Sequence, residues 1–161
     1  MHPKLETLFE EAENRYLKPE ELTVLSQYVE SLPERLEVYR QIRDREIDIM
    51  QTVADRLTAQ FPQESKDTLE RSIKNALLML RYCAMAMLLN DEAFVKERLL
   101  GWLAQSIQTY KTQPIDSALY KLLNQQLYQS LTAKQINLLK PALVLAQTSL
   151  LKLEGASEPK S

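Results

Sequence analysis

The sequence predicts an all-α protein that forms a single domain. Only two glycines occur among its 161 residues, whereas sheet proteins need glycine at many of their turns. Apolar residues recur at helical spacing over most of the chain, and they make up 45% of it, which is typical of a globular protein. A chain of this length buries roughly 70% of the surface that it exposes when unfolded, so it can form a core unaided.

Two short helices are expected first, over about residues 4–14 and 19–30. The second begins at Pro19, a position where the missing N–H costs nothing. Short helices are marginal in water, so their apolar faces must pack on the same chain or on another one. We predict a partner interface there, formed by Leu5, Leu8 and Phe9 in the first helix and by Leu22, Leu25 and Val29 in the second.

A six-helix body is expected next, from five helical ranges of which the last counts as two helices if it divides at Pro141. These ranges are approximately 33–60, 65–90, 91–110, 114–130 and 132–152, the last of which Pro141 should kink or split in two. Two capping boxes, Ser31 with Glu34 and Thr132 with Gln135, mark helix starts. The domain should span residues 1–153, and the polar tail at 154–161 should be disordered.

Composition and charge exclude several classes of function. The net charge is −2 and no basic stripe occurs, which argues against nucleic acid binding. The apolar run at 76–89 contains Arg81 and is too short to span a bilayer, and the N-terminus has no signal-peptide core. With one cysteine and only His2, at a terminus expected to be mobile, neither a metal site nor a nucleophile with a histidine base can be assembled. We therefore expect a cytoplasmic protein that is not an enzyme.

Several segments match a known family in order and spacing. The stretch Arg-Tyr-Leu-Lys-Pro-Glu-Glu-Leu at 15–22 resembles Arg-Tyr-Leu-x-Pro-x-Glu-Leu near the start of phycobiliprotein subunits. Further matches follow at 35–38, 44–46, 54–57, Pro62, 90–91, Gly101 and 112–115. The chain thus resembles the phycobilisome family, including allophycocyanin-like subunits. The resemblance implies a globin-like fold preceded by two short helices that pair with a partner subunit, and light harvesting by a covalently bound bilin in cyanobacteria and red algae.

The family attaches its bilin at Cys-Leu-Arg-Asp, followed a few residues later by Leu-Arg. Aligning that Leu-Arg with residues 80–81 places Ser72, Lys74 and Asn75 at the attachment motif, so the thiol and the pyrrole-binding carboxylate are both missing. A hydroxyl is a much weaker nucleophile than a thiolate, so no covalent cofactor is expected. Lys74 keeps a positive charge that could pair with a propionate.

Simpler explanations exist for each residue of this vestigial site. Ser72 and Asn75 would then be polar residues on the outer face of a helix. Arg81 either pairs with a carboxylate or lines a residual cavity, because an arginine in an apolar run needs some partner. Cys83 lies eleven positions beyond Ser72 and is expected to be a small core residue.

Three functions remain in competition. The first is a non-enzymatic protein that binds phycobiliprotein subunits, or itself as a dimer, in antenna assembly, turnover or regulation, peripheral to the thylakoid. The second is a carrier or sensor that holds a bilin or another apolar ligand non-covalently in a globin-like pocket. The third is a globin-like stress-sensing module without haem, since no internal histidine could ligate the iron. Co-purification of phycobiliproteins would favour the first function, and a visible absorption band of the purified protein would favour the second. A colourless protein without an antenna partner would favour the third.

Overall fold

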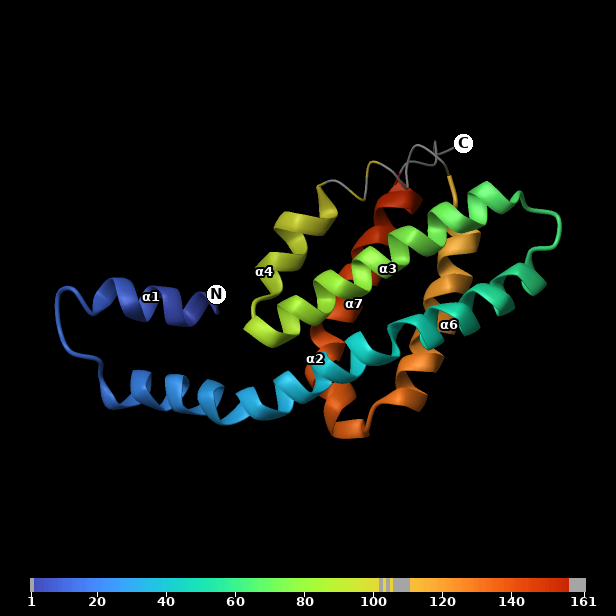
Figure 1. Ribbon diagram of the computed structural model, residues 1–161. Coiled ribbons are helices and arrows are strands. Elements are labelled where there is room, and N and C mark those ends of the chain that lie inside the picture. Colours follow the sequence, from blue (N-terminus) through green and yellow to red (C-terminus); the bar gives the residue numbers. More distant parts are fainter. Residues whose placement is uncertain (1, 102, 104, 106–110, 157–161) are drawn as a thin grey trace.

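The computed structural model describes residues 2–101, 103, 105 and 111–156, and all of its regular elements there are helices (Figure 1). Their bounds are α1 (Pro3–Glu11), α2 (Pro19–Gln60), α3 (Lys66–Leu89), α4 (Glu92–Val95), the π-helical turn η1 (Lys96–Leu100), α6 (Gln113–Ser130) and α7 (Ala133–Ala156). The predicted all-α, globin-like class is confirmed. The expected helix at 91–110 begins as α4 and η1, and its residues 102, 104 and 106–110 lie outside the described part.

The helices divide into a packed body and a projecting arm. The second half of α2 packs with α3, α6 and α7, while α1 and the first half of α2 extend away from this body as two antiparallel helices (Figure 1). We call α1 and residues 19–36 of α2 the arm. The body buries a continuous apolar core, whose largest fully buried side chains include Leu57, Met79, Leu80, Leu99, Leu119, Leu123 and Leu139.

The predicted break between the second and third helices is wrong, because α2 runs without interruption through Pro33. Ser31 caps no helix; its hydroxyl donates to the Tyr28 carbonyl at 2.7 Å. Two hydrogen bonds from α2 to the last turn of α3 lie on either side of the proline. The Tyr28 hydroxyl donates to the Leu88 carbonyl at 3.0 Å, and Arg35 Nη1 donates to the Met87 carbonyl at 2.5 Å. The Leu88 carbonyl lies in the last turn of α3, where carbonyls lack helical partners, whereas the Met87 carbonyl also accepts from the Asn90 N–H at 3.2 Å.

The other helix ends follow local sequence more closely. The capping box at Thr132 is confirmed, since Thr132 Oγ1 accepts from the Gln135 N–H at 3.2 Å and Gln135 Oε1 accepts from the Thr132 N–H at 3.0 Å. Helix α3 ends at Asn90, whose φ of 49° is the left-handed conformation common after helices. Pro141 does not split α7, which continues to Ala156; residues 157–161 of the predicted tail lie outside the described part.

The start of α1 is more ordered than its sequence suggests. His2 Nδ1 accepts from the Lys4 N–H at 3.1 Å and so caps the helix. Its ring meets the Tyr28 ring edge-on at 5.5 Å, and the residue is only 8% exposed. The expectation that His2 is mobile is therefore wrong, because packing against α2 holds it.

Helix α3 is the central element of the body. By length and composition alone it could cross a membrane, and it is the one helix in the described part of the chain that passes this test. Within this fold, however, it contacts α2, α6 and α7, and its apolar residues Leu69, Ala76, Met79, Leu80 and Cys83 belong to the common core.

Candidate functional site

Helix α3 carries all four residues that the sequence predicts for a vestigial pigment site, Ser72, Lys74, Asn75 and Arg81, but does not bring them together. Ser72 is 2% exposed and points into the core, so the expectation of an outer-face serine is wrong. Lys74 is exposed and Asn75 half-buried. Both line a hollow of about 450 Å³ on the charged outer side of α3, which Asp67, Glu70 and Arg71 share.

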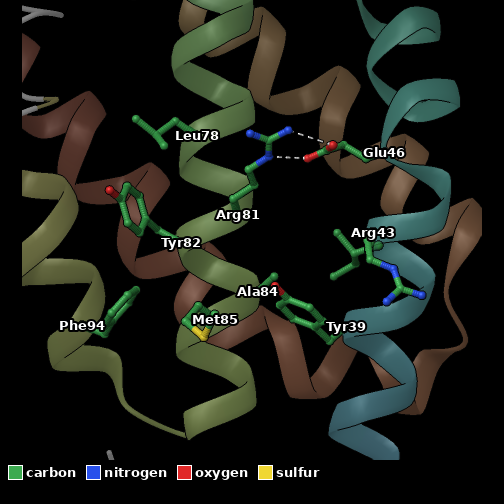
Figure 2. A pocket seen from close by; sticks show the side chains of 10 residues that line it. Tyr39, Arg43, Glu46, Leu78, Arg81, Tyr82, Ala84, Met85 and Phe94 are labelled. Atoms are coloured by element: carbon green, nitrogen blue, oxygen red, sulfur yellow. Dashed lines mark hydrogen bonds and ion pairs between the residues drawn. The ribbon is translucent and has the colours of Figure 1, made fainter.

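Arg81 lies on a second cavity, of about 440 Å³, between α2, α3 and α4 (Figure 2). Its Nε and Nη2 donate to Glu46 Oε1 and Oε2 at 2.7 and 3.0 Å, a two-pronged ion pair across α2 and α3. The hydrogen bonds from Arg81 to Glu46 raise the pKa of the arginine above its ordinary value. Both sequence-based explanations of Arg81 therefore hold, because it pairs with a carboxylate and also lines a cavity.

Aromatic and thioether side chains cover the rest of this cavity. Tyr82 and Phe94 lie with ring centroids 5.8 Å apart at 57°, and Tyr39 and Met85 complete the apolar wall (Figure 2). This wall is not visible in the sequence, because its members come from α2, α3 and α4. The one signal that could have found it was Arg81, an unpaired charge in an apolar run that required a partner such as Glu46.

Among the described residues, the two cavities share one, Leu78. Ser72 lines neither cavity, and Met79 is fully buried. The Arg81 cavity is thus a largely apolar pocket with two arginines, Arg43 and Arg81, and the buried Ser72, which the sequence predicts at the attachment position, does not line it.

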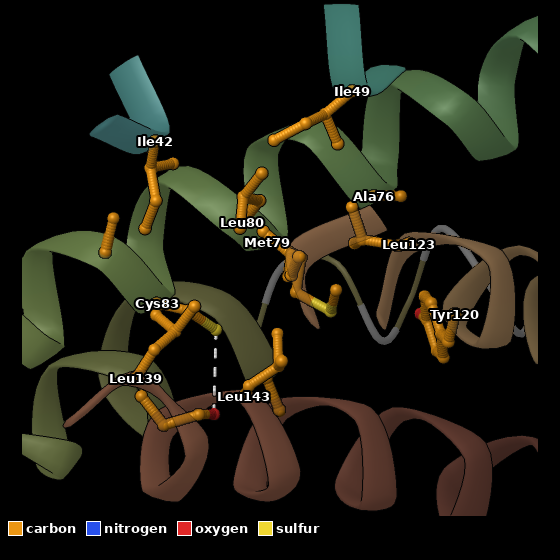
Figure 3. Packing of buried hydrophobic residues seen from close by; sticks show 14 of the residues in the cluster. Ile42, Ile49, Ala76, Met79, Leu80, Cys83, Tyr120, Leu123, Leu139 and Leu143 are labelled. Atoms are coloured by element: carbon orange, nitrogen blue, oxygen red, sulfur yellow. Dashed lines mark hydrogen bonds between the residues drawn. The ribbon is translucent and has the colours of Figure 1, made fainter. Parts of the chain in front are cut away.

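Cys83, the single cysteine of the chain, lies in the core between α3 and α7 (Figure 3). Its thiol donates to the Ala142 carbonyl at a sulfur–oxygen distance of 3.6 Å. Burial raises the pKa of the thiol to about 12. Because the thiolate is the reactive form, this cysteine is chemically inert in the folded protein.

The residues predicted for the partner interface divide between the inside and the outside of the arm. Leu5 is buried, and Leu8 and Leu25 are half-buried. Part of the predicted interface is therefore already packed within this chain. Phe9, Leu22 and Val29 remain 49–55% exposed.

On α2, the exposed apolar residues Leu22 and Val29 belong to a longer row of apolar side chains along the helix. Leu22, Leu25, Val29, Leu32 and Leu36 follow one another at alternating spacings of three and four residues, which places them on one side of the helix. We call these five residues the arm stripe. Each of them is half-buried or exposed, and no element in the described part of the chain covers the stripe fully.

A bidentate ion pair fixes the turn between α1 and α2. Arg15 Nη1 and Nη2 donate to Glu21 Oε1 and Oε2 at 2.7 and 3.3 Å. The Lys18 N–H donates to the same carboxylate at 3.0 Å. These hydrogen bonds, from Arg15 first and then from Lys18, lower the pKa of Glu21. The turn thereby sets the direction of α1 along the arm.

An all-helical, globin-like body that carries a two-helix arm is the fold of phycobiliproteins. A scan of protein-family models matches residues 10–148 to the family described as phycobilisome protein, and the chain belongs to that family. A search of curated proteins finds no match. Members of the family assemble with one another and normally carry covalent bilins. This chain lacks the attachment cysteine, since its one cysteine is the buried Cys83.

Proposed function

We propose that the chain is a non-enzymatic phycobilisome protein that carries no covalent bilin and binds a phycobiliprotein subunit through its arm. It would act in assembly, turnover or regulation of the antenna, on the cytoplasmic side of the thylakoid. Family membership supports the antenna role, since phycobiliproteins are in general structural light-harvesting proteins and not enzymes.

The arm stripe is the observation that carries this proposal. Leu22 and Val29 are exposed on a helix that projects away from the body, together with Phe9 on α1 (Figure 1). Scattered exposed apolar residues are ordinary on soluble proteins, but a continuous row of them marks an interaction surface. The arm therefore offers an apolar face that a similar two-helix arm of another subunit can cover.

The burial gives an estimate of what the stripe contributes. Full burial of a leucine or valine side chain stabilises by roughly 1.5–3 kcal/mol. Leu22 and Val29 still have about half of their surface to bury, so each should contribute about 1 kcal/mol to binding. Loss of both corresponds to a decrease in affinity of about 30-fold, and buried carboxylates would increase that loss.

The test is analytical ultracentrifugation of the chain with purified phycobiliprotein subunits. The double variant Leu22→Asp/Val29→Asp should bind at least about 30-fold more weakly than the parent. The matched control is Val144→Asp, which changes an equally exposed valine on α7 of the body and should bind normally. Circular dichroism should show the same helix content for all three. A parent chain that binds no subunit, or one that only forms a dimer with itself, would refute the proposed partner.

The Arg81 cavity favours a second candidate, a non-covalent carrier or sensor of a bilin or another apolar ligand. Its aromatic wall could cover a planar conjugated ligand, while the outer edge of the Arg81 guanidinium faces solvent, with the side chain 59% exposed. Titration with biliverdin should then shift the absorption of the pigment, and Met85→Trp, which fills the cavity, should abolish the shift. An identical spectral change in the filled variant would exclude this site.

A further inference from the structure

A third cavity, of about 240 Å³, lies where the start of α1 meets α2 and the end of α3. It is separate from the arm stripe and from the Arg81 cavity. Its lining includes His2, Lys4, Tyr28, Arg35 and Asn90. Three of them are basic: His2 and Lys4 at the start of α1, and Arg35 on α2.

The guanidinium of Arg35 is half-buried in this cavity without a counter-charge. Its two hydrogen bonds go to neutral acceptors, the Met87 carbonyl at 2.5 Å and Ser31 Oγ at 2.9 Å. Among the described residues, no carboxylate lies within ion-pair distance of Arg35, and its Nη2 makes no hydrogen bond. Burying a charge costs free energy unless the charge is paired, so a bound anion would stabilise this guanidinium.

Two more donors lie beside it on α1. Lys4 is exposed and also forms no ion pair with a described residue. The Nδ1 atom of His2 accepts a hydrogen bond, so the neutral imidazole carries its proton on Nε2 and can donate there. Burial first, and then the positive charges of Lys4 and Arg35, lower the pKa of His2, while a backbone hydrogen bond of His2 and the charge of Asp91 act in the opposite direction.

We propose that this cavity binds a phosphate-type oxyanion, held by Arg35 on α2 and by Lys4 and His2 on α1. Charged donors from two helices would satisfy a tetrahedral anion with hydrogen bonds that are roughly twice as strong as neutral ones. The bound anion then links the first turn of α1 to α2. It holds α1 against α2 within the arm and so connects anion concentration with the position of α1.

Free phosphate and the phosphoryl group of a larger metabolite share this chemistry, and the experiment separates them. Two-dimensional ¹H–¹⁵N NMR follows the isolated chain, with any purification tag at its C-terminus, during titration with sulfate, inorganic phosphate and glycerol phosphate. Sodium chloride at the same ionic strength is the reference, because salt alone screens surface charge. Saturable shifts should appear at the amides near residues 3–6, 31–35 and 88–91 below about 10 mM anion. Saturation by glycerol phosphate but by neither inorganic anion would assign the site to a phosphorylated metabolite.

Two variants and a control decide the assignment. Lys4→Glu reverses an exposed charge without disturbing the core and should weaken binding of the anion at least tenfold. Lys121→Glu makes the same change on the exposed side of α6 and should bind like the parent. Arg35→Gln should abolish binding. The absence of saturable shifts in the parent, or equal affinities in the parent and Lys4→Glu, would overturn the site. Because no partner protein is present, these results do not depend on the proposed function.

Discussion

A cysteine introduced at position 74 should react readily with an alkylating reagent, whereas the native Cys83 and the variant Ser72→Cys should not. Positions 72 and 74 are two residues apart on α3, but Ser72 is buried and Lys74 is exposed. Comparing thiols at positions 72 and 74 therefore tests whether the side chain at the predicted attachment position is accessible to a reagent.

The expected difference follows from the thiolate population. Burial raises the pKa of Cys83 from 9.0 to about 12, which lowers its thiolate fraction at neutral pH by about 1000-fold. Ser72 is equally enclosed, so a thiol there should be suppressed to a similar extent. Steric exclusion of the reagent adds to this effect, and reaction then requires local opening of the helix.

Iodoacetamide labelling followed by mass spectrometry measures these rates at pH 7.5. Cys83 in the parent and the thiol of Ser72→Cys should label at least about 1000-fold more slowly than the thiol of Lys74→Cys, and all should label alike in concentrated guanidinium chloride. Each protein can also be co-expressed with a bilin synthesis pathway and a lyase, and then run on a denaturing gel that is stained with zinc to make bound bilin fluoresce. Neither the parent nor Ser72→Cys should show a fluorescent band. Rapid labelling of native Cys83, or a bilin band that Cys83→Ser removes, would show that the core is open.

Two further predictions concern the arm. Because the pKa of Glu21 is lowered in the fold, its contribution to stability should be full above its ordinary pKa of 4.5 and be lost as the pH falls through the folded value. Urea unfolding should therefore find Glu21→Gln less stable than the parent at pH 7, by a difference that shrinks as the pH falls below 4.5; a constant difference would contradict the ion pair. Pro33→Ala should raise the free energy of unfolding by about 1–3 kcal/mol, since proline inside a helix is unfavourable and Pro33 is exposed; a loss of stability would show that the proline is needed.

Sequence alone determined the helical class, the family and those helix ends that depend on neighbouring residues. The box formed by Thr132 and Gln135 is correct because its two hydrogen bonds span only three positions. The similar box at Ser31 failed for a reason that lies 52 residues away, where Arg35 donates to the carbonyl of Met87. Such long-range bonds keep α2 continuous through a proline that by local rules should start a new helix.

Tertiary structure alone decided which side of α3 faces which neighbour. This helix is apolar on most sides from residue 76 onward, so its periodicity does not tell the core face from the pocket face. Packing against α2, α6 and α7 turns Ser72 and Cys83 inward and leaves Arg81 beside Glu46, 35 residues earlier in the chain. Burial depends on what surrounds a side chain, and for a central helix those surroundings are supplied by elements distant in sequence.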